Sequence, residues 1–154
     1  MNSLLDYTIS TDIKKMDFAM IHRFLSHSYW AKGIQENVLM NAMDNSLCFG
    51  LFKHNDTQND VQVAFARMIT DKSTFAYLAD VFVLPDYREQ NLSTKLLDAV
   101  ISHPDLQGLR RLMLATLDAH GLYEKYDFKS LDHAETFMQK WNPDIYKTRS
   151  QIEC

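Results

Sequence analysis

The sequence predicts a mixed α/β domain, in which early strands pair antiparallel and one late pair is parallel. Leu47–Lys53 and residues 61–69 are strand-like and flank a polar turn, which is typical of an antiparallel hairpin. Residues 75–84 are apolar on both faces, as a buried central strand should be. A helical stripe over residues 92–103 then leads into the apolar run 112–115. Strand, helix and strand in this order form a βαβ unit, whose two strands are expected to be parallel.

The remaining predicted elements are shorter. Phe18, Ile21, Leu25 and Tyr29 follow helical spacing, and Asp17 stands where an N-cap is expected, so a first helix is predicted that ends at Tyr29 and Trp30. The other predicted elements are an opening strand at residues 7–10, a weaker helix near 34–42, a short helix at 119–126 and a last strand at 136–141.

Length and composition predict one ordinary globular domain that spans residues 1–154. The chain has 154 residues, of which 46% are hydrophobic and 23% charged, which suits a single core. The net charge of −4 argues against a nucleic-acid partner, which favours a basic face. The apolar stretches are too short to span a membrane, and residues 1–10 lack the features of a signal peptide. The expected location is therefore the cytoplasm, with no membrane partner.

Metal and thiol chemistry are not expected. The two cysteines, Cys48 and Cys154, form no CxxC pair, and the six histidines show no metal-ligand spacing. Cys48 lies in an apolar run and is interpreted as a packed thiol, whereas Cys154 is the terminal residue. The polar turn at residues 54–60 lacks the Gly and the closing Glu of an EF-hand, so a solvated turn is preferred to a calcium loop.

The junction after the central strand is the strongest candidate for a binding site. Its sequence, VFVLPDYREQNLSTKLL, passes from a strand through a polar turn into a helix. A helix N-terminus with free N–H groups binds phosphate well, and Arg88 adds positive charge there. Such junctions are common and most bind nothing, so this pattern alone does not define a function.

Two motifs give the chain a resemblance to the GNAT superfamily of acetyl-CoA-dependent N-acetyltransferases. YLADVFVLPDYREQNLSTKLL is similar to the central motif of that family, in which a strand leads into Arg/Gln-x-x-Gly-x-Gly/Ala at the start of a helix. ATLDAHGLYEKYDF is similar to the second motif, a helix that carries Leu-Tyr-x-Lys-x-Gly-Phe. The resemblance covers most of the chain. It implies a mixed, mostly antiparallel sheet of about six or seven strands, flanked by helices and splayed open after the central strand.

The chain departs from both motifs at small residues. Asn91 and Ser93 stand at the two small positions of the first motif, and Asp127 replaces the Gly before Phe128 in the second. Asn is the non-glycine residue most at home at positive φ, Ser suits a helix start, and Asp also tolerates a turn. These changes are therefore compatible with cofactor binding.

The resemblance implies where acetyl-CoA, the expected cosubstrate, would bind. Backbone N–H groups at the start of the helix would hold the pyrophosphate, and the backbone of the central strand would pair with the pantetheine arm. The residues concerned are Arg88, Glu89, Gln90, Asn91, Leu92, Ser93 and Thr94 for the pyrophosphate and Val81, Phe82 and Val83 for the arm.

The catalytic roles that the resemblance implies each have a structural alternative. Tyr123 matches the tyrosine that protonates the departing thiolate, or it is a packed core residue. Asp80, the only charged residue in an apolar strand, is a candidate base acting directly or through water, or a structural hydrogen-bonding group. His120 is a second candidate base or a surface histidine. Tyr29 and Trp30 line the acceptor pocket, or they pack on the sheet.

The implied reaction is the direct attack of an amine on the acetyl group of acetyl-CoA, without a metal. One alternative is a GNAT-like CoA-binding or regulatory module with impaired catalysis, which the changes at Asn91 and Ser93 would favour. A protein or peptide acetyltransferase is another. The sequence does not specify the class of amine, and it leaves a homodimer open.

Overall fold

The structure, a computed structural model, describes residues 4–147 and contains one mixed sheet with the strand order β1-β2-β3-β4-β5. Neighbouring strands are antiparallel from β1 to β4, and β5 is parallel to β4. The strands are β1 (Tyr7–Ser10), β2 (Leu47–Lys53), β3 (Val61–Thr70), β4 (Phe75–Val83) and β5 (Arg111–Leu114). The mixed, mostly antiparallel class is confirmed, with five strands in the described residues rather than six or seven.

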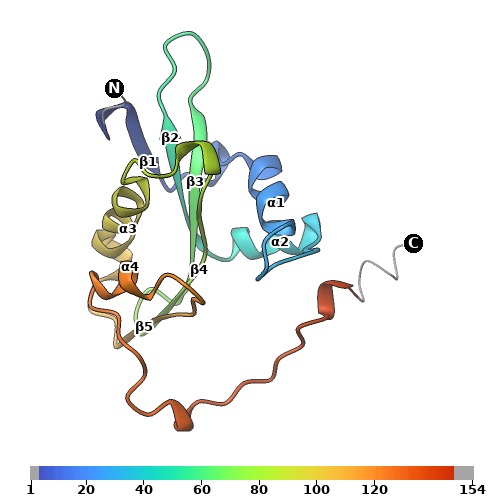
Figure 1. Ribbon diagram of the computed structural model, residues 1–154, viewed down its shortest axis with the longest axis vertical. Helices are drawn as coiled ribbons and strands as arrows, with labels where there is room; N and C mark the ends of the chain where they lie inside the picture. Colours follow the sequence, from blue (N-terminus) through green and yellow to red (C-terminus); the bar gives the residue numbers. More distant parts are fainter. Residues whose placement is uncertain (1–3, 148–154) are drawn as a thin grey trace.

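Helices cover both faces of the sheet, as Figure 1 shows. On one face lie α1 (Phe18–Ser26) and α2 (Glu36–Asp44), and on the other lie α3 (Leu92–Ser102) and α4 (His120–Glu124). Because side chains along a strand alternate between its two faces, residues of β3 contribute to the hydrophobic clusters on both faces of the sheet. Phe65 packs under α1 and α2, while its neighbours on β3 belong to the cluster under α3.

Strand β4 changes course near its middle. Phe65 pairs with Phe82 and Arg67 with Ala79, so two residues of β4 oppose the single residue between them on β3. This is a β-bulge, which kinks the strand. Asp80 lies in the bulge with φ 57°, a left-handed conformation that is rare for a non-glycine residue inside a strand. The pairing of β4 with β5 ends at Leu78 and Leu114, the last residue of β5, so the rest of β4 has no described strand partner on that edge.

Two sequence predictions were wrong in their bounds or type. The first helix ends at Ser26, and Tyr29 and Trp30 lie in the turns that follow it. The hydroxyl of Ser28 causes the change, because it donates to the Leu25 carbonyl at 2.6 Å and accepts from the Ala31 amide at 3.1 Å, which replaces helical bonding with a turn.

The predicted strand at residues 136–141 does not form. Residues 134–136 make a 3-10 turn, and the rest of the segment is extended but unpaired within the described residues. A period-two pattern specifies the two faces of a strand and supplies no partner, so the pattern alone did not decide this segment. Cys154 lies outside the described residues.

Candidate functional site

Because β5 ends at Leu114, the second half of β4 has backbone groups on that edge without a strand partner among the described residues. The Leu84 amide donates to the Val63 carbonyl on β3 at 2.8 Å. Because backbone groups alternate between the two edges of a strand, those of Val83 and Val81 face the opposite edge, beyond the last residue of β5. The role of these groups in holding an extended ligand stays a prediction. The Val83 carbonyl accepts a 3.1 Å bond from Arg88 Nε, so this guanidinium folds along the same edge.

Phe82 lies differently from its neighbours. Its ring is buried on the α1 side of the sheet and stacks on Phe24, with centroids 3.9 Å apart. Its backbone pairs with Phe65 on β3. The Phe82 side chain therefore packs in the hydrophobic core on the α1 side of the sheet.

The turn before α3, residues 88–94 and here called the anion cradle, has a backbone conformation suited to binding an anion. Glu89 and Asn91 have φ of 65° and 59°, both left-handed, on either side of Gln90. Such alternation turns successive N–H groups toward one concave side. Asn91 is the N-cap residue of α3, and its side chain caps no backbone N–H. The N–H groups of Leu92, Ser93 and Thr94 therefore have no partner within the helix. The positive φ expected for Asn91 is observed, and Asp127 is also left-handed, with φ 68°.

Two contacts hold this cradle against the domain. The Tyr7 hydroxyl donates to Gln90 Oε1 at 3.0 Å and joins the turn to β1. Leu92 is buried in the cluster under α3 and fixes the first turn of the helix. Tyr7 is a residue that sequence reasoning missed, because only the sheet order brings β1 near the turn.

Tyr123 lies on α4 next to a cavity of about 260 Å³. Its ring is 9% exposed and packs edge-on to Phe128, with centroids 6.0 Å apart. Burial raises the pKa of its phenol, and the nearby phenol of Tyr29 and the carboxylate of Asp118 raise it further. None of the described residues hydrogen-bonds its hydroxyl. His120 lines the same cavity. The Tyr123 phenol, which none of the other residues in 4–147 hydrogen-bonds, thus lies at the wall of a cavity with its pKa raised.

Asp80 is the centre of a polar network on the α1 side of β4. Its Oδ2 accepts from Arg67 Nε at 2.8 Å, and its Oδ1 accepts from the indole Nε1 of Trp30 at 3.0 Å. Arg67 also donates to Ser46 Oγ at 3.1 Å. The ion pair is largely buried, with side-chain exposures of 15% for Arg67 and 8% for Asp80. Tyr29 packs edge-on against the Trp30 ring, with centroids 5.0 Å apart.

Arg67 and Ser46 are further site residues that the sequence interpretation missed. Arg67 is the only charged residue of β3, just as Asp80 is the only charged residue of β4. Two opposite lone charges in neighbouring apolar strands are a signal for a buried pair, because an unpaired buried charge is costly.

Cys48 is a buried free cysteine. Burial raises the pKa of the Cys48 thiol to about 12, which keeps it protonated, as expected for a packed cysteine. Within residues 4–147, no group of three or more His, Cys, Asp or Glu side chains could hold a metal ion. A second cavity, of about 360 Å³, lies between α1 and the end of β4, with Arg23, His27 and Leu84 in its lining.

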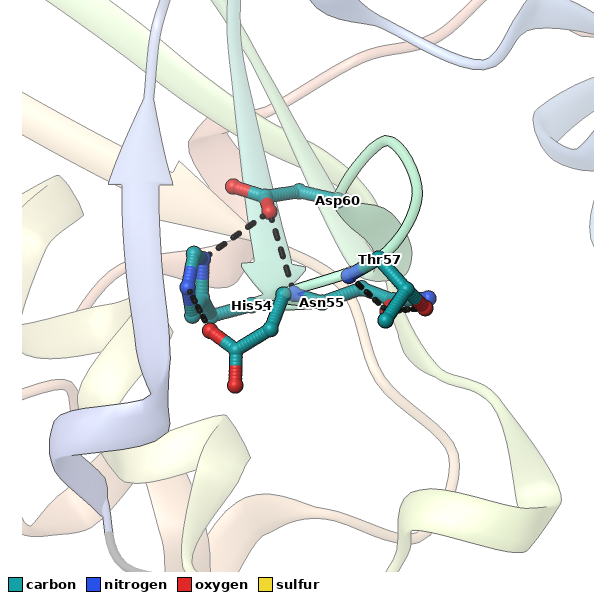
Figure 2. A network of polar contacts seen from close by, with 5 residues as sticks. His54, Asn55, Thr57 and Asp60 are labelled. Carbon is teal, nitrogen blue, oxygen red and sulfur yellow. Dashed lines mark hydrogen bonds and ion pairs between the residues drawn. The ribbon is translucent and has the colours of Figure 1, made fainter.

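The polar turn between β2 and β3 lies at the opposite end of the sheet from β5 (Figure 1). Figure 2 shows the contacts of the Asp60 carboxylate with His54 and with the Asn55 backbone. Asp60 Oδ1 lies 3.1 Å from His54 Nδ1 and accepts from the Asn55 amide at 3.2 Å. His54 Nε2 contacts Asp56 at 2.9 Å. These exposed contacts close the turn internally, in agreement with a solvated turn.

Comparison with known proteins gives a consistent assignment. The sequence model of the Acetyltransferase (GNAT) family matches residues 15–128. A Gibberella zeae protein assigned as an acetyltransferase is 33% identical over 138 residues, which cover 78% of this chain and 77% of that protein. A crystal structure assigned to the GNAT family, from Xanthomonas campestris pv. campestris, is 49% identical with a TM-score of 0.84 and covers 91% of this chain and 96% of that one.

More distant structures share the fold. An acetyltransferase from Clostridium acetobutylicum, solved with acetyl-CoA, has a TM-score of 0.58 at 17% identity and covers 88% of this chain and 94% of that chain. None of the helices within residues 4–147 is long and apolar enough to cross a membrane. The family match spans both motifs, the β4–α3 junction and the α4 tyrosine, and with the 49% identical structure it shows that this chain belongs to the GNAT family of acetyltransferases.

Proposed function

We propose that this chain transfers the acetyl group of acetyl-CoA to an amine acceptor by direct attack. The observations that support the proposal are the β4 edge beyond Leu78, which pairs with no described strand, the left-handed turn before α3 and the buried phenol of Tyr123. Family membership supports acetyl transfer, and the choice of an amine as acceptor belongs to the proposal.

The chain fits acetyl-CoA through its main chain. Backbone groups of Val81 and Val83 would pair with the extended pantetheine arm, and the N–H groups that follow Asn91 would bind the pyrophosphate. The left-handed φ values of Glu89 and Asn91 supply the concave backbone that glycine supplies elsewhere in the family. Since these contacts need no particular side chain, the loss of both small residues does not remove them.

Acetyl-CoA supplies an activated acyl group and a thiolate leaving group. As the new N–C bond forms and the C–S bond breaks, the amine must lose a proton and the departing sulfur must gain one. Tyr123 would donate its phenolic proton to the sulfur, a role suited to a phenol whose raised pKa keeps it protonated. Asp80, acting through a water molecule, would accept the proton from the amine.

The acceptor would bind on the α1 side of β4. Trp30 donates a hydrogen bond to Asp80, Tyr29 packs against the Trp30 ring, and Tyr29 also contributes to the raised pKa of Tyr123. Arg67 neutralises the Asp80 carboxylate and fixes its orientation. We propose that Tyr29 and Trp30 form the roof of this acceptor site.

Calorimetry and a turnover screen test this proposal. Binding of CoA should release measurable heat, and acetyl-CoA should be consumed with at least one amine among a polyamine, an amino acid, an aminoglycoside and a peptide. Absence of heat with folded protein would refute the acetyl-CoA site. Binding without turnover on any of these amines would favour the regulatory CoA-binding module instead.

A further inference from the structure

We propose that the amine acceptor of this chain carries an anionic group, a carboxylate or a phosphate, which binds at Arg23 in the cavity between α1 and the end of β4. This inference rests on the proposed function, because it names the class of acceptor. Binding of the anion can be measured without turnover, so the inference and the proposed function can fail independently.

The cavity of about 360 Å³ combines an apolar wall with a positive charge. Its volume falls in the range of small-molecule sites. Met20, Phe24 and Leu84 supply the apolar wall and belong to the hydrophobic cluster under α1 and α2. Arg23 and His27, both exposed, follow at helical spacing on the same side of α1 and supply polar atoms. This lining suits a ligand with an apolar stem and a charged head.

The guanidinium of Arg23 has no carboxylate partner in residues 4–147. None of the ion pairs in this part of the chain includes Arg23. Arg67, by contrast, donates to the Asp80 carboxylate at 2.8 Å and neutralises it. A guanidinium binds carboxylates and phosphates through two parallel hydrogen bonds. Arg23 is therefore available to an anion from solution.

The other polar groups of the cavity add no permanent charge. Nδ1 of His27 lies 2.7 Å from the Arg23 carbonyl oxygen, and because a carbonyl only accepts, Nδ1 carries the hydrogen. Nε2 of His27 can then donate to an anion only when the ring is protonated. The Ser28 hydroxyl is used within its own turn, by the Leu25 carbonyl and the Ala31 amide. The charge that selects an anion is therefore that of Arg23, which persists throughout the physiological pH range.

The cavity borders the proposed acceptor site through Phe24. The Phe24 ring stacks on Phe82 with centroids 3.9 Å apart and lies 6.3 Å from the ring of Trp30. Trp30 in turn donates to Asp80, the proposed base. Phe82 and Leu84 follow Asp80 by two and four residues, so the cavity lies roughly 7–13 Å along the strand from that carboxylate.

This spacing sets the length of the acceptor. An amine that reaches Asp80 while its anion binds at Arg23 must hold the two groups several carbons apart. In an α-amino acid a single carbon separates them, so the spacing favours an ω-amino acid or an ω-amino phosphate. An amine without an anion would leave Arg23 unpaired and would bind more weakly.

Three amines of matched chain length test the anion site in protein without CoA, where no transfer can occur. They are hexylamine, ε-aminocaproate and ω-aminohexyl phosphate, which end in a methyl, a carboxylate and a phosphate group. At least one anionic amine should bind about tenfold or more tightly than hexylamine, because it gains hydrogen bonds between charged groups. It should also shift the amide NMR signals of residues 20–28, and the tighter of the two identifies the anion. Equal affinity for all three amines, or shifts confined to other residues, would overturn the inference.

Variants of Arg23 assign the preference to this side chain. Arg23→Gln should abolish the preference for the anionic amine, and Arg23→Lys should retain part of it because the charge stays. Arg110→Gln is the matched control, since Arg110 is exposed and its amide bonds to the Thr74 carbonyl at the end of β4 far from Leu84. It should keep the full preference. A preference that survives Arg23→Gln would contradict the assignment, and so would a tenfold loss of CoA affinity in this variant, which would place Arg23 at the cofactor.

Turnover separates the inference from the proposed function. With acetyl-CoA, kcat/KM should be about tenfold or more higher for the anionic amine than for hexylamine, and Arg23→Gln should remove this difference. If hexylamine is acetylated as efficiently as both anionic amines, the inference is wrong and the acetyltransferase proposal stands. If an anionic amine binds at the cavity and no amine is acetylated, the proposed function fails with its acceptor, and only the anion site remains.

Discussion

The indole Nε1 of Trp30 donates a hydrogen bond to Asp80 Oδ1 across 3.0 Å, which joins the turn after α1 to the bulge of β4. The other carboxylate oxygen is held by Arg67. Asp80 adopts a left-handed φ inside a strand, a conformation that costs about 1–3 kcal/mol and persists only where the surroundings enforce it. The bulge and its two partners supply that enforcement, so the acceptor side of the site is held by one network.

Trp30→Phe tests whether this network orients the acceptor. A hydrogen bond to a charged group contributes about 1.5–3 kcal/mol, and the partial exposure of Trp30 favours the lower end. We expect kcat/KM for the acceptor to fall about tenfold, which corresponds to about 1.4 kcal/mol. The affinity for CoA, measured by calorimetry, should not change. A fall in CoA affinity of the same size would contradict an acceptor-side role.

Asp80→Asn separates a base from an orienting group. If Asp80 accepts the proton of the amine, kcat should fall about 10²–10⁴-fold, beyond the effect of Trp30→Phe. If Asp80 only anchors Trp30, Asp80→Asn should lower kcat no more than Trp30→Phe, because the amide oxygen can still accept from the indole, and the loss of the ion pair with Arg67 should appear as a lower melting temperature. Steady-state kinetics and melting temperatures of the two variants distinguish these outcomes.

Tyr123→Phe should lower kcat about 10²–10⁴-fold and leave CoA affinity nearly unchanged, because the proposed proton transfer occurs only as the C–S bond breaks. The melting temperature should move little, since none of the described residues hydrogen-bonds this hydroxyl. The matched control is Tyr126→Phe, which loses bonds to Asp98 at 2.8 Å and to the Thr94 carbonyl at 3.2 Å. It should cost about 1 kcal/mol of stability while kcat holds. An unchanged kcat in Tyr123→Phe would remove the phenol from the mechanism.

The pH dependence of the reaction follows from the same phenol. Burial, Tyr29 and Asp118 all raise the pKa of Tyr123, so its acid form persists above the ordinary tyrosine value of about 10. Loss of the proton from Tyr123 should therefore cause no decline in kcat as the pH rises from about 8 to 10. A descending limb in this range that disappears in Tyr123→Phe would contradict the assignment.

Asn91→Gly should leave CoA affinity equal or raise it, because glycine adopts a φ of 59° without the steric penalty of a side chain. Asn91→Ala should weaken binding, since the left-handed region costs such a residue about 1–2 kcal/mol. Lys72→Gly is the matched control, because Lys72 has a φ of 63° in the turn between β3 and β4. It should stabilise the fold without altering CoA affinity. A tenfold loss of affinity in Asn91→Gly would show that the amide side chain binds the ligand.

The turn at His54 should respond to pH. Hydrogen bonds with Asp56 and Asp60 raise the pKa of His54 in the folded protein. The stabilisation is therefore complete below the unfolded value of about 6.5 and is lost as the pH rises through the raised folded pKa. Amide exchange in residues 54–60 should be slower at pH 6 than at pH 8, after correction for intrinsic rates. His54→Asn should remove the difference, and high salt should reduce it, because the contacts are exposed.

Local chemistry determined much of the fold from the sequence alone. Hydrophobic periodicity predicted β2, the core of β3 and β4, the helix α3 and the parallel partner β5, because burial of one face imposes these periods on any strand or helix. The conformation of Asn91 was also predictable, since the tolerance of Asn for positive φ is a property of the residue itself. The resemblance of two motifs to the GNAT family added the expected arrangement of these elements in an acetyltransferase fold.

Tertiary structure alone decided the features that depend on a partner. The pairing of Asp80 with Arg67 and Trp30, and of Tyr7 with Gln90, depends on strand register and sheet order, which no local pattern encodes. The bulge at Asp80 likewise arises from the match of β4 to β3. Residues 136–141 show the same limit, because a strand needs the backbone of a neighbour to form. Their sequence provides a suitable face, but only the tertiary structure shows that no strand within residues 4–147 pairs with them.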